Sequence, residues 1–131
     1  MKMRPPAIPI VNIDPYFSVW AEHSLFKRPV HWTGSPNNIW GTAEIDGTAW
    51  HFFGENTGLP AMTLEAMEID AFSTVLTYTA AGIRLTVHFT SPTLITDLYY
   101  VSRPVAYCKV SFESMDGNAH TVNVCFSCSE E

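Results

Sequence analysis

The chain is short of positive charge and of long apolar runs, and each shortage excludes a class of protein. Its 131 residues hold 7 lysines and arginines against 13 aspartates and glutamates, a net charge of −6. This balance provides no basic face for a nucleic acid, and no basic run longer than Lys27-Arg28 suggests an anionic membrane surface. No apolar run approaches the roughly eighteen residues of a transmembrane helix. The first residues lack the apolar stretch of a signal peptide, and the compartment stays open.

Cysteine is too scarce for a disulfide scaffold. Cys108, Cys125 and Cys128 are an odd number near the C-terminus, and we interpret them as small buried apolar residues. Cys125 and Cys128 form a C-x-x-C pattern, but a structural zinc site takes four ligands and only His120 is nearby. Strand alternation also directs these two thiols to opposite faces. We therefore expect neither a metal nor a cofactor.

Helical periodicity is missing too, and alternation of apolar and polar residues takes its place. An Asp46-Gly47 turn predicts a hairpin that pairs Ile45 with Thr48, Ala43 with Trp50, and Gly41 with Phe52. An Ala81-Gly82 turn predicts a second hairpin that pairs Ala80 with Ile83, Tyr78 with Leu85, Leu76 with Val87, and Thr74 with Phe89. A third hairpin, with a loop at 115–119, is expected to pair Phe112 with Val122, Val110 with Val124, Cys108 with Phe126, and Ala106 with Cys128. In this register Cys108 and Cys125 are not opposite each other, so no disulfide between them is expected.

The remaining segments complete an all-β prediction. We expect further strands at Ile8–Asn12, Tyr16–Ala21, Met62–Ala71 and Leu94–Tyr100, and a long loop over Glu22–Asn38. Glu65 and Glu68 indicate a solvated edge strand. Trp20, Trp40 and Trp50 are expected in the core. The whole pattern predicts one domain over residues 1–131, an antiparallel β-sandwich built largely from hairpins.

No catalytic motif is present: the chain lacks a G-x-S-x-G elbow, a Walker loop and H-E-x-x-H, and no catalytic residue is predicted. His31 and Trp32, in the long loop, are the sharpest candidates for a ligand cleft, with Asp14 or Glu22 as an acidic partner. The alternative is that His31 bonds to the loop backbone while Trp32 covers the open edge of the sandwich. The ligand-binding candidates are therefore Asp14, His31 and Trp32. We expect His51 and His88 on outer faces and His23 in a loop.

Several separated motifs carry a resemblance to a known family. They are Asp14-Pro15-Tyr16-Phe17-Ser18-Val19-Trp20, His31-Trp32-Thr33-Gly34, Ile45-Asp46-Gly47, Pro60-Ala61-Met62 and Ser102-Arg103-Pro104-Val105-Ala106-Tyr107. Together they resemble the N-terminal region of the glutaminase A-like family. The resemblance implies a β-sandwich region followed by an α-helical toroid domain, with glutamine amide hydrolysis as the activity. Residues 1–60 would hold the N-terminal motifs and residues 61–131 the start of a second β region, expected to stop before it is complete.

No residues here correspond to the helical domain, so no catalytic group is carried over from the family. We expect a non-catalytic β-sandwich that braces the helical catalytic domain of a parent protein, or lends the loop around His31 and Trp32 to the rim of its cleft. The alternative is a free-standing module whose exposed aromatic rings hold a carbohydrate or a peptide. A homodimer through exposed edge strands is a third expectation. Whether the chain is itself an enzyme stays open.

Overall fold

The computed structural model describes residues 5–14, 16–22, 24–55, 58–91, 96–103 and 105–129, and within these ranges nearly all of the regular secondary structure is strand. The elements are β1 Ala7–Asp14, β2 Phe17–Glu22, β3 Val30–His31, β4 Asn38–Ile45, β5 Thr48–Phe53, β6 Thr63–Ile69, β7 Ser73–Ala80, β8 Ile83–Thr90, α1 Leu98–Val101, β9 Tyr107–Ser114 and β10 Val122–Ser129.

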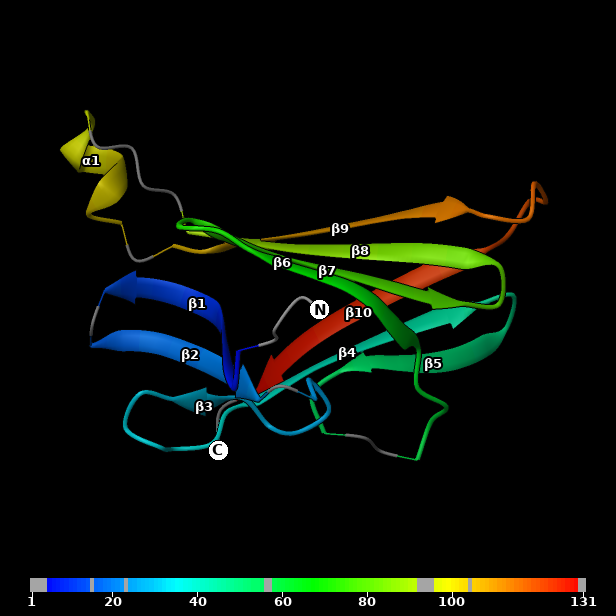
Figure 1. The fold of residues 1–131 in the computed structure, drawn as a ribbon, viewed down its shortest axis with the longest axis horizontal. Coiled ribbons are helices and arrows are strands. Elements are labelled where there is room, and N and C mark those ends of the chain that lie inside the picture. The colour runs from blue at the N-terminus through cyan, green and yellow to red at the C-terminus, as the bar shows by residue number, and fades with distance from the viewer. Residues whose placement is uncertain are drawn as a thin grey trace.

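The strands form three antiparallel sheets. A four-stranded sheet in the order β6-β7-β8-β9 packs over a three-stranded sheet in the order β10-β4-β5, and the third sheet, β1-β2-β3, lies at one end (Figure 1). The hydroxyl of Thr74 on β7 donates a hydrogen bond of 2.7 Å to the carbonyl of Pro9, which ties β1 to the four-stranded sheet. The prediction of an all-β antiparallel sandwich is confirmed.

Two tight turns set the hairpin registers. The φ angles are positive at Asp46 (50°) and Gly47 (83°), and again at Ala81 (49°) and Gly82 (79°), as type I′ turns require. The β7–β8 hairpin has the predicted pairing at every position.

The β4–β5 hairpin departs from its prediction at one end. An irregularity between Gly41 and Thr42 places Gly41 opposite Phe53 rather than Phe52. The Phe52 ring nevertheless lies against Gly41, so closely that a Cβ atom there would overlap it. A small residue is therefore required at Gly41, although the reason is ring packing rather than direct strand pairing.

The third predicted hairpin is wrong. β9 pairs with β8, placing Phe112 opposite Leu85 and Val110 opposite Val87, whereas β10 pairs with β4 in the other sheet. Alternation shows which face of a strand is apolar, but it does not choose between neighbours, and β8 and β4 offer matching apolar faces. The three cysteines are free thiols and exposed, so the expectation that they are buried is also wrong. Cys108 and Cys125 lie on strands of different sheets.

The strand expected at Leu94–Tyr100 is also wrong in the part that the structure describes. Residues 98–101 form the helical turn α1, and Leu94 and Ile95 lie outside the described residues. The predicted loop of 22–38 contains the short strand β3, which pairs with β2. The first, second and sixth strands occur close to where they were expected, at Ala7–Asp14, Phe17–Glu22 and Thr63–Ile69.

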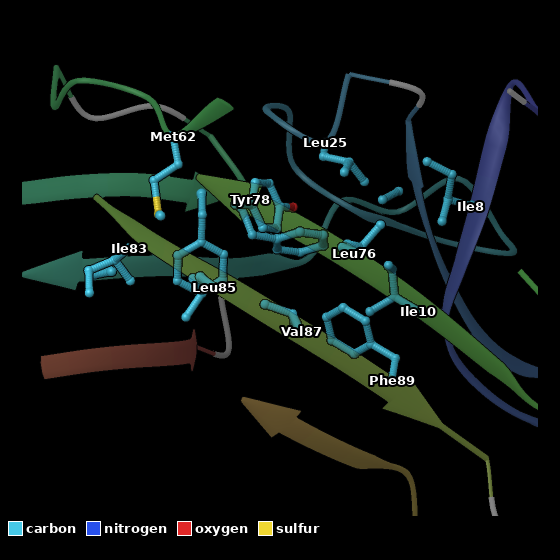
Figure 2. Close-up of a cluster of buried hydrophobic side chains, with 14 of the residues drawn as sticks. Ile8, Ile10, Leu25, Met62, Leu76, Tyr78, Ile83, Leu85, Val87 and Phe89 are labelled. Atoms are coloured by element: carbon cyan, nitrogen blue, oxygen red, sulfur yellow. The ribbon is translucent and has the colours of Figure 1, made fainter. Parts of the chain in front are cut away.

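One core joins all three sheets (Figure 2). Its buried apolar residues are Ile8, Ile10, Ala21, Leu25, Ala43, Ile45, Phe52, Phe53, Met62, Leu76, Tyr78, Ile83, Leu85, Val87 and Phe89. Trp20, Trp40 and Trp50 are half-buried rather than fully internal. Neither β9 nor β10 contributes a fully buried residue, and Phe112, which faces the core side, is 53% exposed. β6, at the far edge of the four-stranded sheet, contributes none either, so the sandwich is least covered along its outer strands β6, β9 and β10.

Candidate functional site

A cleft open to solvent lies between the β1–β2 hairpin and the turn that joins β6 to β7. Its volume is about 670 Å³, within the usual range for small-molecule sites. Strands β1 and β2 and the segments that follow β3, β6 and β8 supply its lining: Asn12, Ile13, Asp14, Ser18, Trp20, Trp32, Ala71, Phe72 and Ser91. Three aromatic rings therefore share the cleft with several short polar side chains.

Trp32 is exposed yet held in a fixed orientation. Its indole Nε1 donates a hydrogen bond of 2.7 Å to the carbonyl of Tyr16, and its ring meets the Tyr16 ring edge to face at 5.9 Å. Its backbone N–H donates to the carbonyl of Ser18 at 3.1 Å. Half of its surface, 51%, remains accessible. An exposed ring that is already ordered is suited to stacking on a ligand, because little rotamer entropy is lost on binding.

Asp14 lies at the end of β1 in the same cleft. Its Oδ1 accepts a hydrogen bond of 2.7 Å from the backbone N–H of Tyr16, two residues ahead. The structure thus brings two of the sequence candidates, Asp14 and Trp32, to one cleft. An aromatic ring and a carboxylate together can hold a ligand that has an apolar face and hydroxyl or amide donors.

His31 lies outside the cleft. Its Nδ1 is 3.0 Å from the hydroxyl of Thr33, and its ring meets the Phe17 ring edge at 6.2 Å. Glu22, considered as an acidic partner, forms an ion pair of 2.9 Å with Lys27 instead. The His31 main chain is bonded to the loop backbone, because its N–H donates to the Ser35 carbonyl and its carbonyl accepts from the Gly34 N–H, each at 2.8 Å. Its imidazole is bonded to a loop hydroxyl instead.

His51 is buried, with 1% of its surface exposed, so its expected place on an outer face is wrong. A distant segment covers the strand there. The His51 N–H donates to the Pro60 carbonyl at 2.8 Å, and the Met62 N–H donates to the His51 carbonyl at 2.9 Å. Burial lowers the pKa of His51 and favours its neutral form. His88 is half-buried, and His23 lies outside the described residues.

A second polar cluster, absent from the sequence prediction, fastens three turns at the opposite end of the sandwich. His120 Nδ1 is 2.5 Å from Asp46 Oδ2, and its Nε2 is 2.9 Å from Asp116 Oδ1. Asp46 Oδ1 also accepts from the Thr121 N–H at 2.9 Å, and the Met115 N–H donates to the carbonyl of Gly82 at 2.8 Å. The signal in the sequence was the pair of Asp-Gly turns at positions 46 and 116, with a histidine close behind the second.

The electrostatics of this cluster favour the ion-paired form. Hydrogen bonds to Asp46 and Asp116 raise the pKa of His120, and the hydrogen bond from His120 lowers the pKa of both carboxyls. The stabilisation from His120 is complete below its unfolded pKa of about 6.5 and is lost as pH rises through its higher folded pKa. The carboxyls stabilise above their unfolded pKa of about 3.9 and less as pH falls through their lower folded values. The cluster is therefore strongest between about pH 4 and 6.5.

Within the described ranges, no group of three histidine, cysteine, aspartate or glutamate side chains is arranged to hold a metal ion. Across the same residues, no helix has the length and apolarity needed to cross a membrane.

Two family models match this chain, one over each half. Residues 1–66, half of the sequence, match the family described as Domain of unknown function (DUF4964). The chain belongs to the DUF4964 family. Residues 72–131 match a second one, Domain of unknown function (DUF5127). The first range ends inside β6 and the second begins just before β7, so the two meet within one hairpin of this DUF4964 protein.

The chain also matches part of a much longer protein. Glutaminase A of Aspergillus oryzae is 28% identical to this DUF4964 chain, over 92% of the chain and 19% of glutaminase A. The chain thus spans about a fifth of that relative, to which it is distantly related. No solved structure matches the chain.

Proposed function

We propose that this chain is the non-catalytic β-sandwich portion of a glutaminase A-like hydrolase, and that it braces a helical catalytic domain. The observation that carries the proposal is the asymmetric coverage of the alignment, 92% of this chain against 19% of glutaminase A. Almost everything in this fold is shared with a protein about five times as long. The sandwich is then a supporting part, and the amide chemistry belongs to the rest of the larger protein.

The arrangement of titratable groups supports a non-catalytic role. Hydrolysis of an amide needs a nucleophile whose proton is directed at a base, with a third group orienting that base. The only hydroxyl bonded to a histidine ring within the described residues is that of Thr33, and it donates instead to Ser35 at 3.2 Å. His120 has both ring nitrogens bonded to carboxylates and is therefore a structural ion pair.

Two assays test this proposal. The isolated chain, incubated with glutamine, is expected to release no ammonia above the buffer rate. Removing the matching segment from Aspergillus oryzae glutaminase A is expected to lower the thermal midpoint of the remaining protein, because a packed surface becomes exposed. Ammonia release by the isolated chain that disappears in Thr33→Ala would refute the non-catalytic role. An unchanged midpoint after the deletion would refute the bracing role.

A second candidate function is a binding module, favoured by the cleft that holds Asp14 and Trp32. An ordered indole beside a carboxylate fits the apolar face and hydroxyls of a pyranose ring. Calorimetric titration with maltose, cellobiose and chitobiose tests this reading, with millimolar binding expected to disappear in Trp32→Ala. Phe112→Ala is the matched control, because Phe112 is equally exposed but lies on β9. A flat titration with all three sugars would count against the module.

A further inference from the structure

Strand β9 forms a free edge of the four-stranded sheet. It pairs with β8 on one side, and within the described residues no strand pairs with it on the other. Its two faces differ. Cys108, Val110 and Phe112 lie opposite buried residues of β8, so they point toward the core side, while Lys109, Ser111 and Glu113 point away. An edge of this kind offers unpaired backbone donors and acceptors to another strand.

The sequence of β9 is complementary to itself when it is reversed about Ser111. In that antiparallel register, Lys109 lies opposite Glu113 of a second copy and Val110 lies opposite Phe112 of the second copy, and each contact occurs twice. Opposite charges and apolar pairs directly across two strands are the favourable cross-strand contacts. A shift by one residue would place the charged face of one strand beside the apolar face of the other.

The other edges of the two large sheets lack this property. β6, at the far edge of the same sheet, carries Glu65 and Glu68 without a lysine or arginine, so two copies of it would repel each other. β10 carries no charged side chain at all, and nothing in it selects one register. β5 is the far edge of the β10-β4-β5 sheet, and its His51 already forms a β-bridge with Ala61 of the same chain. Charge complementarity therefore singles out β9.

We propose that two copies of this chain associate through antiparallel β9–β9 pairing about a two-fold axis at Ser111. The two four-stranded sheets then form one continuous sheet across the dimer. Glu113 keeps its 2.7 Å ion pair with Arg84 and also meets Lys109 of the second copy. The pairing covers Phe112, which is 53% exposed in the single chain. This inference does not depend on the proposed role beside a catalytic domain.

A charge-swap series tests the pairing by sedimentation equilibrium on the 131-residue chain, from about 1 µM to 1 mM. Lys109→Glu and Glu113→Lys are each expected to weaken the dimer by about tenfold or more, because two attractive contacts become repulsive. Glu113→Lys also breaks the exposed ion pair with Arg84 of its own chain, so Lys109→Glu is the cleaner of the two single variants. The double variant is expected to return to within about threefold of the original affinity. Lys109 and Glu113 are about 13 Å apart along one strand, so their coupling has to come from the second copy.

Glu65→Lys is the control, because it changes the net charge as Glu113→Lys does but lies on β6. It is expected to leave the dimer intact. Thermal melts of each variant verify folding, and Lys109→Glu alters only an exposed side chain. A chain that stays monomeric at 1 mM would overturn the proposal. So would a dimer whose affinity the double variant fails to restore, since that dimer would use another surface.

Discussion

Tyr78 provides the sharpest test of the packing. Its side chain is completely buried at 0% exposure, and its ring lies 5.6 Å from the Phe52 ring. Figure 2 shows the hydroxyl among apolar side chains, and that oxygen has no hydrogen-bond partner among the described residues. Burial raises the pKa of the phenol, so the group stays neutral at every ordinary pH. The replacement Tyr78→Phe removes this oxygen and keeps the ring.

We expect Tyr78→Phe to stabilise the protein, against the usual trend of core substitutions. Burying a hydroxyl without a partner costs about 1–3 kcal/mol in protein mutational data. The oxygen also makes dispersion contacts that the variant loses, so we place the net gain at about 1 kcal/mol. With an unfolding entropy of about 2.1 cal/mol/K for each of the 131 residues, this gain raises Tm by about 4 °C.

Urea unfolding followed by circular dichroism measures the change, with Tm as a second readout. Tyr107→Phe is the control, because Tyr107 is 59% exposed and its hydroxyl should count for less than about 0.5 kcal/mol. The reasoning is refuted if Tyr78→Phe lowers the free energy of unfolding by more than about 0.5 kcal/mol. Such a loss would mean that an ordered water or another group satisfies the hydroxyl.

Three further predictions follow from the turns and the sheets. In His120→Asn, the fall in Tm above about pH 6.5 should be weaker than in the original chain, because the ion pairs with the two aspartates are gone; superimposable pH profiles would contradict this. Gly41→Ala should lower the free energy of unfolding in urea by about 1–3 kcal/mol, since the new methyl group displaces the Phe52 ring, and an unchanged value would show that the ring moves freely. Residues 1–70 and 71–131, produced separately, should each lack a cooperative thermal transition; a sharp transition in either piece would contradict a shared core.

Local turn chemistry made part of this fold predictable. The Ala81-Gly82 turn selects a register, and the alternating residues on either side confirm it, so every pair of the β7–β8 hairpin could be derived. Distant partners were not predictable in the same way. The pairing of β9 with β8 and of β10 with β4 depends on which apolar face finds which neighbour, and alternation is silent on that choice.

In the candidate site too, local contacts could be predicted from the sequence and distant ones could not. The hydrogen bond that Asp14 makes is local, since its short carboxylate accepts from the backbone two residues ahead. The cleft was only partly foreseen, because Phe72 and Ser91 reach it from segments far along the chain. The burial of His51 likewise results from a covering segment around Pro60. Whether a side chain is exposed depends on which other segments pack over its strand, and the sequence of that strand alone does not specify them.

The β10–β4 ladder also sets an order of events during synthesis. It joins Val122 to Ile45, across most of the chain. A ribosome adding about 5–20 residues per second needs roughly 4–15 seconds to pass from one strand to the other. Through that interval the nascent β4–β5 hairpin has an open edge that any passing strand could occupy. A chaperone that shields extended segments near the exit tunnel would therefore raise the yield of correctly folded chains, and slow codons before β10 would lower it.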